Sequence, residues 1–538
     1  MIRTWPSYAA IDDRDCPQQT AAKARIGLMV PGDSTRRPKE FETFALGPAG
    51  AVLDRIEFDD QSADQALADI GSGRGRRGSL NEGLRLWTRH AVENYLSATA
   101  ALTGRDGLQL SPYSREWAVQ EHFGEESAGA VHEQCVTGRR YAAEGLRELR
   151  ILRPGSVERR QTDRAETAAA ARVLADGRDV YAAPWQKPYV MRRGVPRVEW
   201  LRVVEIGCLD GSTRVLFDDT AERARADYRQ YAEEPLRAAI EGGEYRPGLH
   251  CADCKLVSLC PRVQQAPGLL GIDGPETRWR SWSVTAGREH AKCARRAYLA
   301  ALWLPAAELA ESAAIRRGRA VHASLEHQHR KVPVERCRSA DAPEATDLLR
   351  IGDYVLEGTE AALAVQMIGD HAAVCPWRGP SPSAEAAVER SVFVFDQTAN
   401  VLVTAKIDLL HARDGAWVLR ETKTRRAASV VDPLGEYPQL ALALVLAASG
   451  VTIDGLRIAK VELEFLGGSG PVIVPFYPED RFTLLRARAI VRQHSEAWRM
   501  DTAFKHSVGK HCADCRVARW CADAPEERIG TEKPEGEE

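Results

Sequence analysis

A repeated cysteine motif constrains this chain more than any other feature. The pentapeptide HCADC begins at His250 and again at His511, and a third cysteine follows each copy at the same distance. The two trios share the spacing C-x2-C-x5-C and are Cys251, Cys254 and Cys260, and Cys512, Cys515 and Cys521. Identical thiol spacing at two distant places predicts metal ligation at both and two related units in one chain.

Each trio lacks a fourth ligand nearby, and one lone cysteine near the start of each half is the candidate. Cys16 and Cys293 both follow a serine-started segment and precede a stretch typical of a helix. Four thiolates can hold an iron-sulfur cluster or a tetrahedral zinc ion, and the residues alone leave both open. The other cysteines are interpreted as ordinary buried side chains: Cys135, Cys208, Cys337 and Cys375.

Other landmarks keep the same order in both halves. Residues 201–217 and 456–476 each predict a strand, a glycine-containing turn and a second strand, and a helical stretch follows each. Residues 264–276 are rich in Gly and Pro and predict a boundary. The predicted organisation is a first domain at 1–265, a linker at 266–276, a second domain at 277–523, and an acidic disordered tail at 524–538.

Residues 401–424 place candidate catalytic side chains on a β-hairpin. Alternating apolar residues predict two strands joined at an Asp-Gly turn, with Asp408 as the last residue of the first strand. Glu421 and Lys423 share one face of the second strand, alongside Asp408. Neighbouring carboxylates repel unless a cation lies between them, and their oxygens suit Mg²⁺ or Mn²⁺. The hairpin predicts metal-assisted phosphodiester hydrolysis. The alternative interpretation is that these charged residues simply form the solvent-exposed face of a strand.

The pattern D-x12-E-x-K after an apolar strand resembles that of the PD-(D/E)XK nuclease superfamily. Residues 317–322, RGRAVH, resemble the helix start of its RecB-like branch, whose histidine approaches the metal. Gln439 resembles the first residue of that branch's Q-x-x-x-Y motif. The chain departs from the motif at Ala443, where the branch has tyrosine, and Tyr437 is a candidate substitute.

The resemblance implies a role for each matching residue. His322, Asp408, Glu421 and the backbone carbonyl of Thr422 would hold Mg²⁺ or Mn²⁺, and Lys423 would position the attacking water. The implied catalytic set is His322, Asp408, Glu421, Lys423 and Gln439. The resemblance further implies the fold: two tandem restriction-endonuclease-like α/β units, each with a mixed central sheet flanked by helices and closed by a four-cysteine metal cluster.

A lone cysteine far before such a trio is similar to the iron-sulfur staple of the RecB-like AddB and CRISPR-adaptation exonucleases. The resemblance therefore favours a 4Fe-4S cluster in each half, with zinc as the alternative. The implied ligands of the first cluster are Cys16, Cys251, Cys254 and Cys260. Those of the second are Cys293, Cys512, Cys515 and Cys521.

Only the second half carries the catalytic pattern. Between residues 135 and 156, Arg140 or Tyr141 falls where the aspartate is expected, and no Glu-x-Lys follows. Residues 1–265 are therefore predicted to be a degenerate nuclease-like domain that holds DNA or a partner, with a flexible basic loop at 71–78. In the second half, Glu389 is interpreted as a surface charge at the start of a strand.

Net charge and hydropathy limit the function classes. A net charge of −3 argues against a uniformly basic nucleic-acid coat, although short basic clusters at 74–77, 316–319 and 425–426 can meet phosphates. No apolar run reaches the roughly 18 residues that a bilayer requires, and no signal-peptide core begins the chain. We therefore expect a cytoplasmic protein without a membrane partner.

The sequence thus predicts a Mg²⁺- or Mn²⁺-dependent deoxyribonuclease, an exonuclease of DNA repair, recombination or anti-phage defence. DNA is the expected substrate, and a helicase or another repair or defence subunit is a further expected partner. The alternative is a non-catalytic DNA-binding or scaffolding subunit whose clusters are purely structural. A cysteine-based redox protein is disfavoured because no thioredoxin-like βαβ context surrounds the cysteines.

Overall fold

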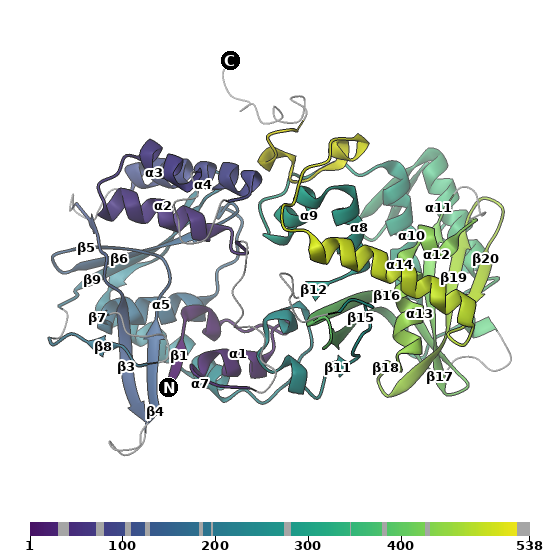
Figure 1. The fold of residues 1–538 in the computed structure, drawn as a ribbon, viewed down its shortest axis with the longest axis horizontal. Helices are drawn as coiled ribbons and strands as arrows, with labels where there is room; N and C mark the ends of the chain where they lie inside the picture. Colours follow the sequence, from purple (N-terminus) through teal and green to yellow (C-terminus); the bar gives the residue numbers. More distant parts are fainter. Residues whose placement is uncertain are drawn as a thin grey trace. The chain divides into compact units, whose positions relative to one another are not determined.

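The computed structural model describes residues 1–30, 42–71, 80–102, 109–123, 130–181, 187–194, 197–273, 281–344, 346–378, 385–425 and 431–524. By its internal contacts the chain divides into two compact units, and Figure 1 labels most of their helices and strands. Unit 1 comprises Met1–Arg262, Lys292–Ala307 and Thr502–Glu538. Unit 2 comprises Val263–Ala291 and Glu308–Asp501. The predicted basic loop from residue 72 and acidic tail from residue 525 lie outside the described residues.

The sheet of unit 2 forms around the predicted hairpin. Its strands are β11 (Gln264–Gln265), β12 (Ser281–Trp282), β15 (Ala386–Asp396), β16 (Val401–Arg413), β17 (Ala416–Thr424), β18 (Thr452–Ile453), β19 (Leu456–Leu466) and β20 (Val472–Phe476). β15, β16 and β17 are antiparallel neighbours, β19 runs parallel to β17, and β20 runs antiparallel to β19. A separate two-stranded sheet contains β13 (Leu348–Ile351) and β14 (Tyr354–Glu357).

The turn between β16 and β17 has the predicted form. Asp414 and Gly415 both have positive φ, at 52° and 72°. A two-residue hairpin turn of this kind matches the right-handed twist of its strands, and Asp-Gly adopts it at little cost. The turn sets the register of the hairpin and so determines which residues of the two strands face one another.

Helices cover both the sheet and the candidate site of unit 2. They are α8 (Val284–Lys292), whose last residue falls in unit 1, α10 (Ala313–His329), α11 (Gly358–His371), α12 (Pro433–Glu436), α13 (Pro438–Ala448) and α14 (Arg481–Met500). α13 packs against both β19 and α14, and every residue from Leu440 to Leu446 is buried. A helix that is apolar on all faces is expected only where it is enclosed in a core. This helix therefore anchors the parallel connection from β17 to β19.

The predicted linker at 266–276 is instead part of the core of unit 2 as far as Ile272. β11 pairs in parallel with β15, and Ala266, Leu269, Leu270 and Ile272 are buried in the main apolar cluster. The irregular backbone here is held by Asp396, whose carboxylate accepts hydrogen bonds from the N–H groups of Gly268 and Leu270. Gly and Pro correctly indicated turns, but the apolar residues between them decided where the segment packs.

In the part of unit 1 that the structure describes, the strands form two five-stranded sheets. Their strands are β1 (Ile2–Thr4), β2 (Ser111–Pro112), β3 (Trp117–Phe123), β4 (Ala130–Cys135), β5 (Arg139–Ala143), β6 (Leu146–Arg153), β7 (Arg178–Tyr181), β8 (Val190–Met191), β9 (Trp200–Gly207) and β10 (Thr213–Thr220). One sheet has the order β1-β4-β3-β7-β8 and the other has the order β10-β9-β6-β5-β2.

The helices of unit 1 come from the first half of the chain and from a short segment near its middle. They are α1 (Pro17–Ala24), α2 (Leu46–Phe58), α3 (Ala63–Gly71), α4 (Glu82–Ala101), α5 (Arg164–Asp176), α6 (Ala221–Asp227), α7 (Glu233–Glu241) and α9 (Ala294–Ala301). Among the helices of the described ranges, none is both long and apolar enough to cross a membrane.

Four strands of each unit share one arrangement. β5, β6, β9 and β10 are joined by antiparallel, parallel and antiparallel pairings, as are β16, β17, β19 and β20. A helix lies in the connection of each parallel pair, α5 in unit 1 and α13 in unit 2. Cys16 and Cys293 are the N-cap residues of α1 and α9. These four strands therefore have the same order and directions in both units.

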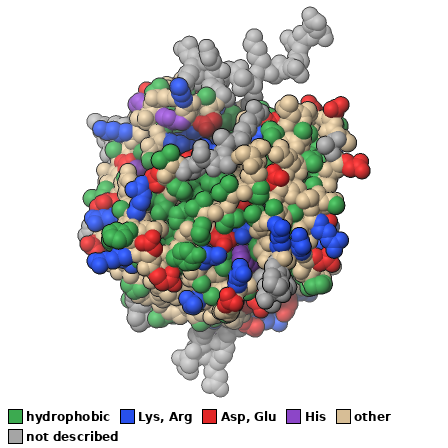
Figure 2. All heavy atoms as spheres, turned by 90° about the vertical axis from the view of Figure 1, so that its right-hand side faces the viewer, with side chains coloured by type: hydrophobic (Ala, Val, Ile, Leu, Met, Phe, Trp, Pro, Cys, Tyr) green, Lys and Arg blue, Asp and Glu red, His purple; other side chains and the backbone are tan. Residues whose placement is uncertain are grey.

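The face of the molecule in Figure 2 carries a mixture of charges. Lys and Arg side chains lie among Asp and Glu side chains on this face, with hydrophobic side chains between them. This pattern agrees with a net charge close to zero.

Candidate active site

Asp408 and His322 lie together against the unit 2 sheet. Asp408 lies within β16, an interior strand that continues to Arg413, so the prediction that it ends this strand is wrong. Asp408 is on β16, and its Oδ2 accepts a hydrogen bond of 2.9 Å from the backbone N–H of Thr422 on β17. His322 is on α10, and its Nδ1 lies 3.9 Å from the same oxygen. Both side chains are partly exposed, so a small ligand can reach them.

Arg317 and Gly318, at the start of the same helix as His322, explain why α10 passes so close to the sheet. A Cβ atom at Gly318 would lie 2.9 Å from Oγ1 of Thr424 on β17, so the absent side chain permits the close approach. The neighbouring Arg317 is buried and forms an ion pair with Glu360 on α11. The Arg-Gly pair therefore has a structural role, because it positions the helix that carries His322.

Glu421 is held by two of the other predicted residues. Its Oε1 accepts hydrogen bonds from Lys423 Nζ at 2.5 Å and from Gln439 Nε2 at 3.0 Å. Burial and the nearby Asp408 carboxylate raise the pKa of Glu421. Burial lowers the pKa of Lys423, but Glu421 and Asp408 raise it more, so the lysine remains an ammonium. The structure thus brings together Asp408, Glu421, Lys423 and Gln439.

Glu389 was interpreted as a surface charge, and that interpretation is corrected. Its carboxylate lies with His322 and Asp408 in a group whose ligand atoms are all within 4.8 Å of one another. Glu389 faces Asp408 across the β15–β16 pair and has φ of 52°, between residues in regular register. The signal in the sequence was a glutamate just before an apolar strand antiparallel to the strand of Asp408.

Tyr437 lies beside the site, although Ala443 occupies the motif position expected for tyrosine. The Tyr437 ring is 5.8 Å from Lys423 Nζ, and its hydroxyl accepts a hydrogen bond of 3.1 Å from Arg425. Ala443 is buried in the core with the rest of α13. A tyrosine at 443 would have to fit among packed apolar side chains.

The comparison with protein families agrees with this geometry. Residues 281–522 match the model of the PD-(D/E)XK nuclease superfamily, and this part of the chain is a domain of that superfamily. The match spans α10, the β16–β17 hairpin and α13, which carry the site described above. A search of curated proteins found no match to the chain.

The superfamily indicates a nuclease-type function that uses divalent metal ions. The residues present fit such an ion, since two carboxylates and an imidazole converge within 4.8 Å. Burial, together with the nearby Asp408 carboxylate, raises the pKa of Glu421 even though Lys423 pairs with it. Hard oxygen donors with one nitrogen suit Mg²⁺ or Mn²⁺. Glu421 lies next to this group rather than within it, because Lys423 and Gln439 hold its carboxylate.

The two predicted four-cysteine sets both belong to unit 1. Cys293, Cys512, Cys515 and Cys521 line a single pocket. In the other set, burial and the nearby Cys251, Cys16 and Cys260 raise the pKa of Cys254 to about 11. Each lone cysteine is therefore close to its trio.

The histidine of each HCADC motif has the same local contact. A ring nitrogen of His250 lies 2.9 Å from the carbonyl oxygen of Arg246, and one of His511 lies 2.6 Å from that of Ser507. In each case the partner is the residue four positions earlier. Hydrogen bonds to Cys16 and Cys251 raise the pKa of His250 to about 10. The repeated motif thus encodes a repeated fold of the backbone around its cysteines.

In unit 1 the residues at the catalytic positions are different. Counted from the paired residues beside each hairpin turn, Gly138 stands where unit 2 has Asp408, whereas the sequence alone suggested Arg140 or Tyr141. Ile151 and Arg153 occupy the places of Glu421 and Lys423. A Cβ atom at Gly138 would lie 2.7 Å from the carbonyl oxygen of Arg150, so no carboxylate can be placed there without movement of the backbone.

Proposed function

We propose that residues 281–522 form a Mg²⁺- or Mn²⁺-dependent deoxyribonuclease that removes nucleotides from a DNA end. The observation that carries the proposal is the convergence of His322, Glu389 and Asp408 beside the Glu421–Lys423 pair. This set supplies both ligands for a hard cation and a positioned ammonium group.

The proposed roles follow from the contacts. Asp408, Glu389 and His322 hold the ion, with Glu421 and the carbonyl group of Thr422 next to them. A bound ion would polarise the phosphoryl oxygen and lower the pKa of the attacking water. Lys423 orients that water and offsets negative charge that develops at the phosphate. Gln439 and Lys423 keep the Glu421 carboxylate in place, and Thr422 does the same for Asp408.

DNA is supported as the substrate by basic residues of unit 2 near the site. Arg316 and Arg319 are exposed on the turn of α10 that precedes His322, and Arg319 also pairs with Glu311. Arg425 lies just after the end of β17, two residues beyond Lys423, and also pairs with Glu436. Guanidinium groups at these places can bind the phosphates on either side of the scissile bond. DNA repair, recombination and anti-phage defence are the processes that require such an activity, and a helicase that supplies unwound ends is the proposed partner.

Unit 1 is proposed to be a degenerate copy of the same nuclease unit. The shared strand arrangement, the repeated cysteine motif and the N-cap cysteines of α1 and α9 support a tandem duplication. Gly138 and Ile151 leave the copy without a carboxylate pair, so it would bind DNA or a partner without cutting.

Each four-cysteine set is proposed to hold a 4Fe-4S cluster rather than one zinc ion. Tetrahedral zinc requires thiolate sulfurs only about 3.8 Å apart, whereas each thiolate of a cubane binds a different iron. Among the described residues, two groups bring three or more metal-binding side chains within 4.8 Å of one another, and neither contains a cysteine of these sets. The wider spacing supports the larger cluster.

One assay tests the nuclease proposal. The full-length protein, purified with its cysteine-bound metal, is mixed with end-labelled single- and double-stranded DNA, with and without Mg²⁺ or Mn²⁺. Metal-dependent release of labelled nucleotides is expected. If neither ion supports cleavage, the proposal fails and a scaffolding role for the chain remains.

A further inference from the structure

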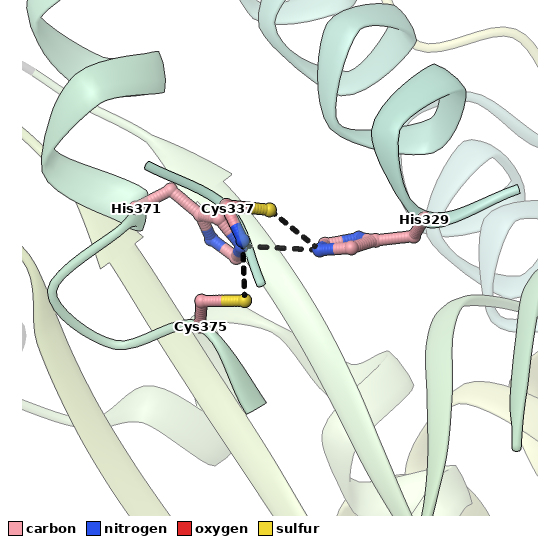
Figure 3. Close-up of side chains that lie close together, drawn as sticks. All are labelled: His329, Cys337, His371 and Cys375. Carbon is pink, nitrogen blue, oxygen red and sulfur yellow. Dashed lines mark hydrogen bonds between the residues drawn. The ribbon is translucent and has the colours of Figure 1, made fainter. Parts of the chain in front are cut away.

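Two histidines and two cysteines outside the nuclease motif meet inside unit 2. His329 is the last residue of α10, Cys337 lies in the segment that follows, His371 ends α11, and Cys375 lies just after α11. Figure 3 shows the four side chains pointing toward one another from these segments. From the sequence, Cys337 and Cys375 were interpreted as ordinary buried cysteines. Their proximity to His329 and His371 was not predicted.

The distances within this His/Cys quartet are those of a metal coordination shell. All four ligand atoms lie within 4.8 Å of one another. His329 Nε2 lies 3.3 Å from His371 Nε2 and 3.3 Å from Cys337 Sγ. A tetrahedral zinc ion with bonds of 2.0–2.3 Å separates its ligand atoms by about 3.3–3.8 Å. The quartet thus already has nearly the spacing that a single ion requires.

The quartet is buried and supported from outside. His329, Cys337, His371 and Cys375 are each less than 5% exposed. His371 turns its Nδ1 toward Glu464 Oε1 at 2.7 Å, and this leaves Nε2 directed at the other three ligands. A carboxylate on the far nitrogen is the usual support of a metal-bound histidine, since it fixes the tautomer and the ring orientation.

We propose that the His/Cys quartet is a structural zinc site that is separate from both the nuclease site and the four-cysteine sets. Four protein ligands of the Cys2His2 type close the coordination shell, so no position is left for water or substrate. Zinc suits this set better than Mg²⁺ or Mn²⁺, which bind oxygen donors.

The site would fix the elements that carry the nuclease residues. His329 lies two turns after His322 on the same face of α10, so an ion at one end of the helix limits rotation at the other. On the side of the sheet, Glu464, the partner of His371, accepts a hydrogen bond of 2.9 Å from Thr422 Oγ1. The backbone N–H of Thr422 in turn donates a hydrogen bond to Asp408. The zinc would therefore hold two sides of the nuclease site without touching substrate.

Metal analysis of full-length variants tests the proposal. His329→Ala should lower the zinc content by one equivalent per chain, as measured by mass spectrometry of the metals. His327→Ala is the matched control, because His327 is an exposed histidine on the same helix and its loss should leave the zinc content unchanged. Iron content should be the same in wild type and both variants. The zinc content is measured without DNA cleavage, so the zinc proposal can be confirmed or refuted whether or not the protein is a nuclease.

A rescue variant keeps the test decisive if His329→Ala does not fold. His329→Cys should retain the zinc, because three cysteines and one histidine also form a structural zinc set. Zinc-edge X-ray absorption should then show one more sulfur ligand per chain than in wild type. The proposal is overturned by less than one zinc in wild type, by an unchanged zinc content in soluble His329→Ala, or by an unchanged sulfur count in His329→Cys. A Cys337–Cys375 disulfide found by mass spectrometry would also overturn it.

Discussion

Thr422 donates its backbone N–H to Asp408 Oδ2 at 2.9 Å across the β16–β17 hairpin. The contact positions the carboxylate from the neighbouring strand, next to His322. The Thr422 side chain lies on the face of β17 opposite to Glu421 and Lys423, and its hydroxyl donates a hydrogen bond to Glu464. One residue thus links the candidate nuclease site to the His/Cys quartet, and both sites depend on the register of the hairpin.

Asp408→Ala should abolish cleavage and weaken the binding of Mg²⁺ or Mn²⁺. The variant removes one carboxylate from the group with His322 and Glu389, and the remaining donors bind a reluctantly dehydrating cation poorly. Titration calorimetry with Mn²⁺ and a cleavage assay measure the two effects. Asp414→Asn, at the exposed tip of the same hairpin, is the control and should change neither. Retained cleavage in Asp408→Ala would contradict the assigned role.

Lys423→Ala should separate catalysis from binding. The carboxylates remain, so the ion and DNA should still bind, while kcat falls by about 10²-fold or more because a positioned charge is lost. Single-turnover cleavage and Mn²⁺ titration of the same protein provide the measurement. A variant that cuts at the wild-type rate would show that the lysine only pairs with Glu421.

Glu389→Ala and Lys406→Ala together decide what Glu389 does. The two side chains form an ion pair on the surface of the sheet, and Lys406 is the more exposed of them. If Glu389 is a metal ligand, only Glu389→Ala should weaken Mn²⁺ binding, by about tenfold or more. Lys406→Ala removes the partner and leaves the carboxylate in place, so it should not. If the two substitutions change the Mn²⁺ affinity equally, the only role of Glu389 is its ion pair with Lys406.

Protein purified without oxygen should contain about eight irons per chain if both four-cysteine sets hold cubanes. Cys515→Ala should lose about half of this iron and lower the thermal stability, because cluster binding is coupled to folding. Cys208→Ala, a buried cysteine outside the sets, should keep all of it. Zinc in stoichiometric amount at both sets, without iron, would refute the cluster assignment.

The Arg420–Glu462 pair should make the stability of unit 2 depend on acid. Burial raises the pKa of Glu462, but His411 and Arg420 lower it more, and the net result is far below the usual range for glutamate. Because the folded-state pKa is depressed, the pair stabilises the fold above the unfolded pKa, near 4.5, and this contribution is lost as pH falls.

Glu462→Gln should therefore lower the free energy of unfolding by about 3 kcal/mol at pH 7, and by less as the pH decreases below about 4.5. Urea unfolding across this pH range gives the measurement. Asp454→Asn breaks the exposed pair with Arg390 and should cost less than about 1 kcal/mol. A penalty for Glu462→Gln that does not change with pH would contradict the predicted ionisation.

Local sequence patterns predicted the hairpin and the residues on it. Asp-Gly at 414–415 fixes a two-residue turn, and the period of two then places Glu421 and Lys423 on one face. The thiol spacing of HCADC predicted that each lone cysteine lies near its trio, and the pocket of Cys293 with Cys512, Cys515 and Cys521 agrees with it. The hairpin and the backbone around each trio depend on short stretches of chain, whereas each lone cysteine lies more than 200 residues before its trio and reaches it only through the fold.

What the sequence by itself determined was therefore the local chemistry, and what only the tertiary structure decided was its long-range partners. Glu389 joins the site because β15 pairs with β16. Residues 266–272 enter the core because their apolar side chains pack there while Asp396 holds their backbone. His329, Cys337, His371 and Cys375 converge only once α10 and α11 pack together. Sequence periodicity does not predict these long-range contacts, because they form when distant segments bury apolar surface against one another.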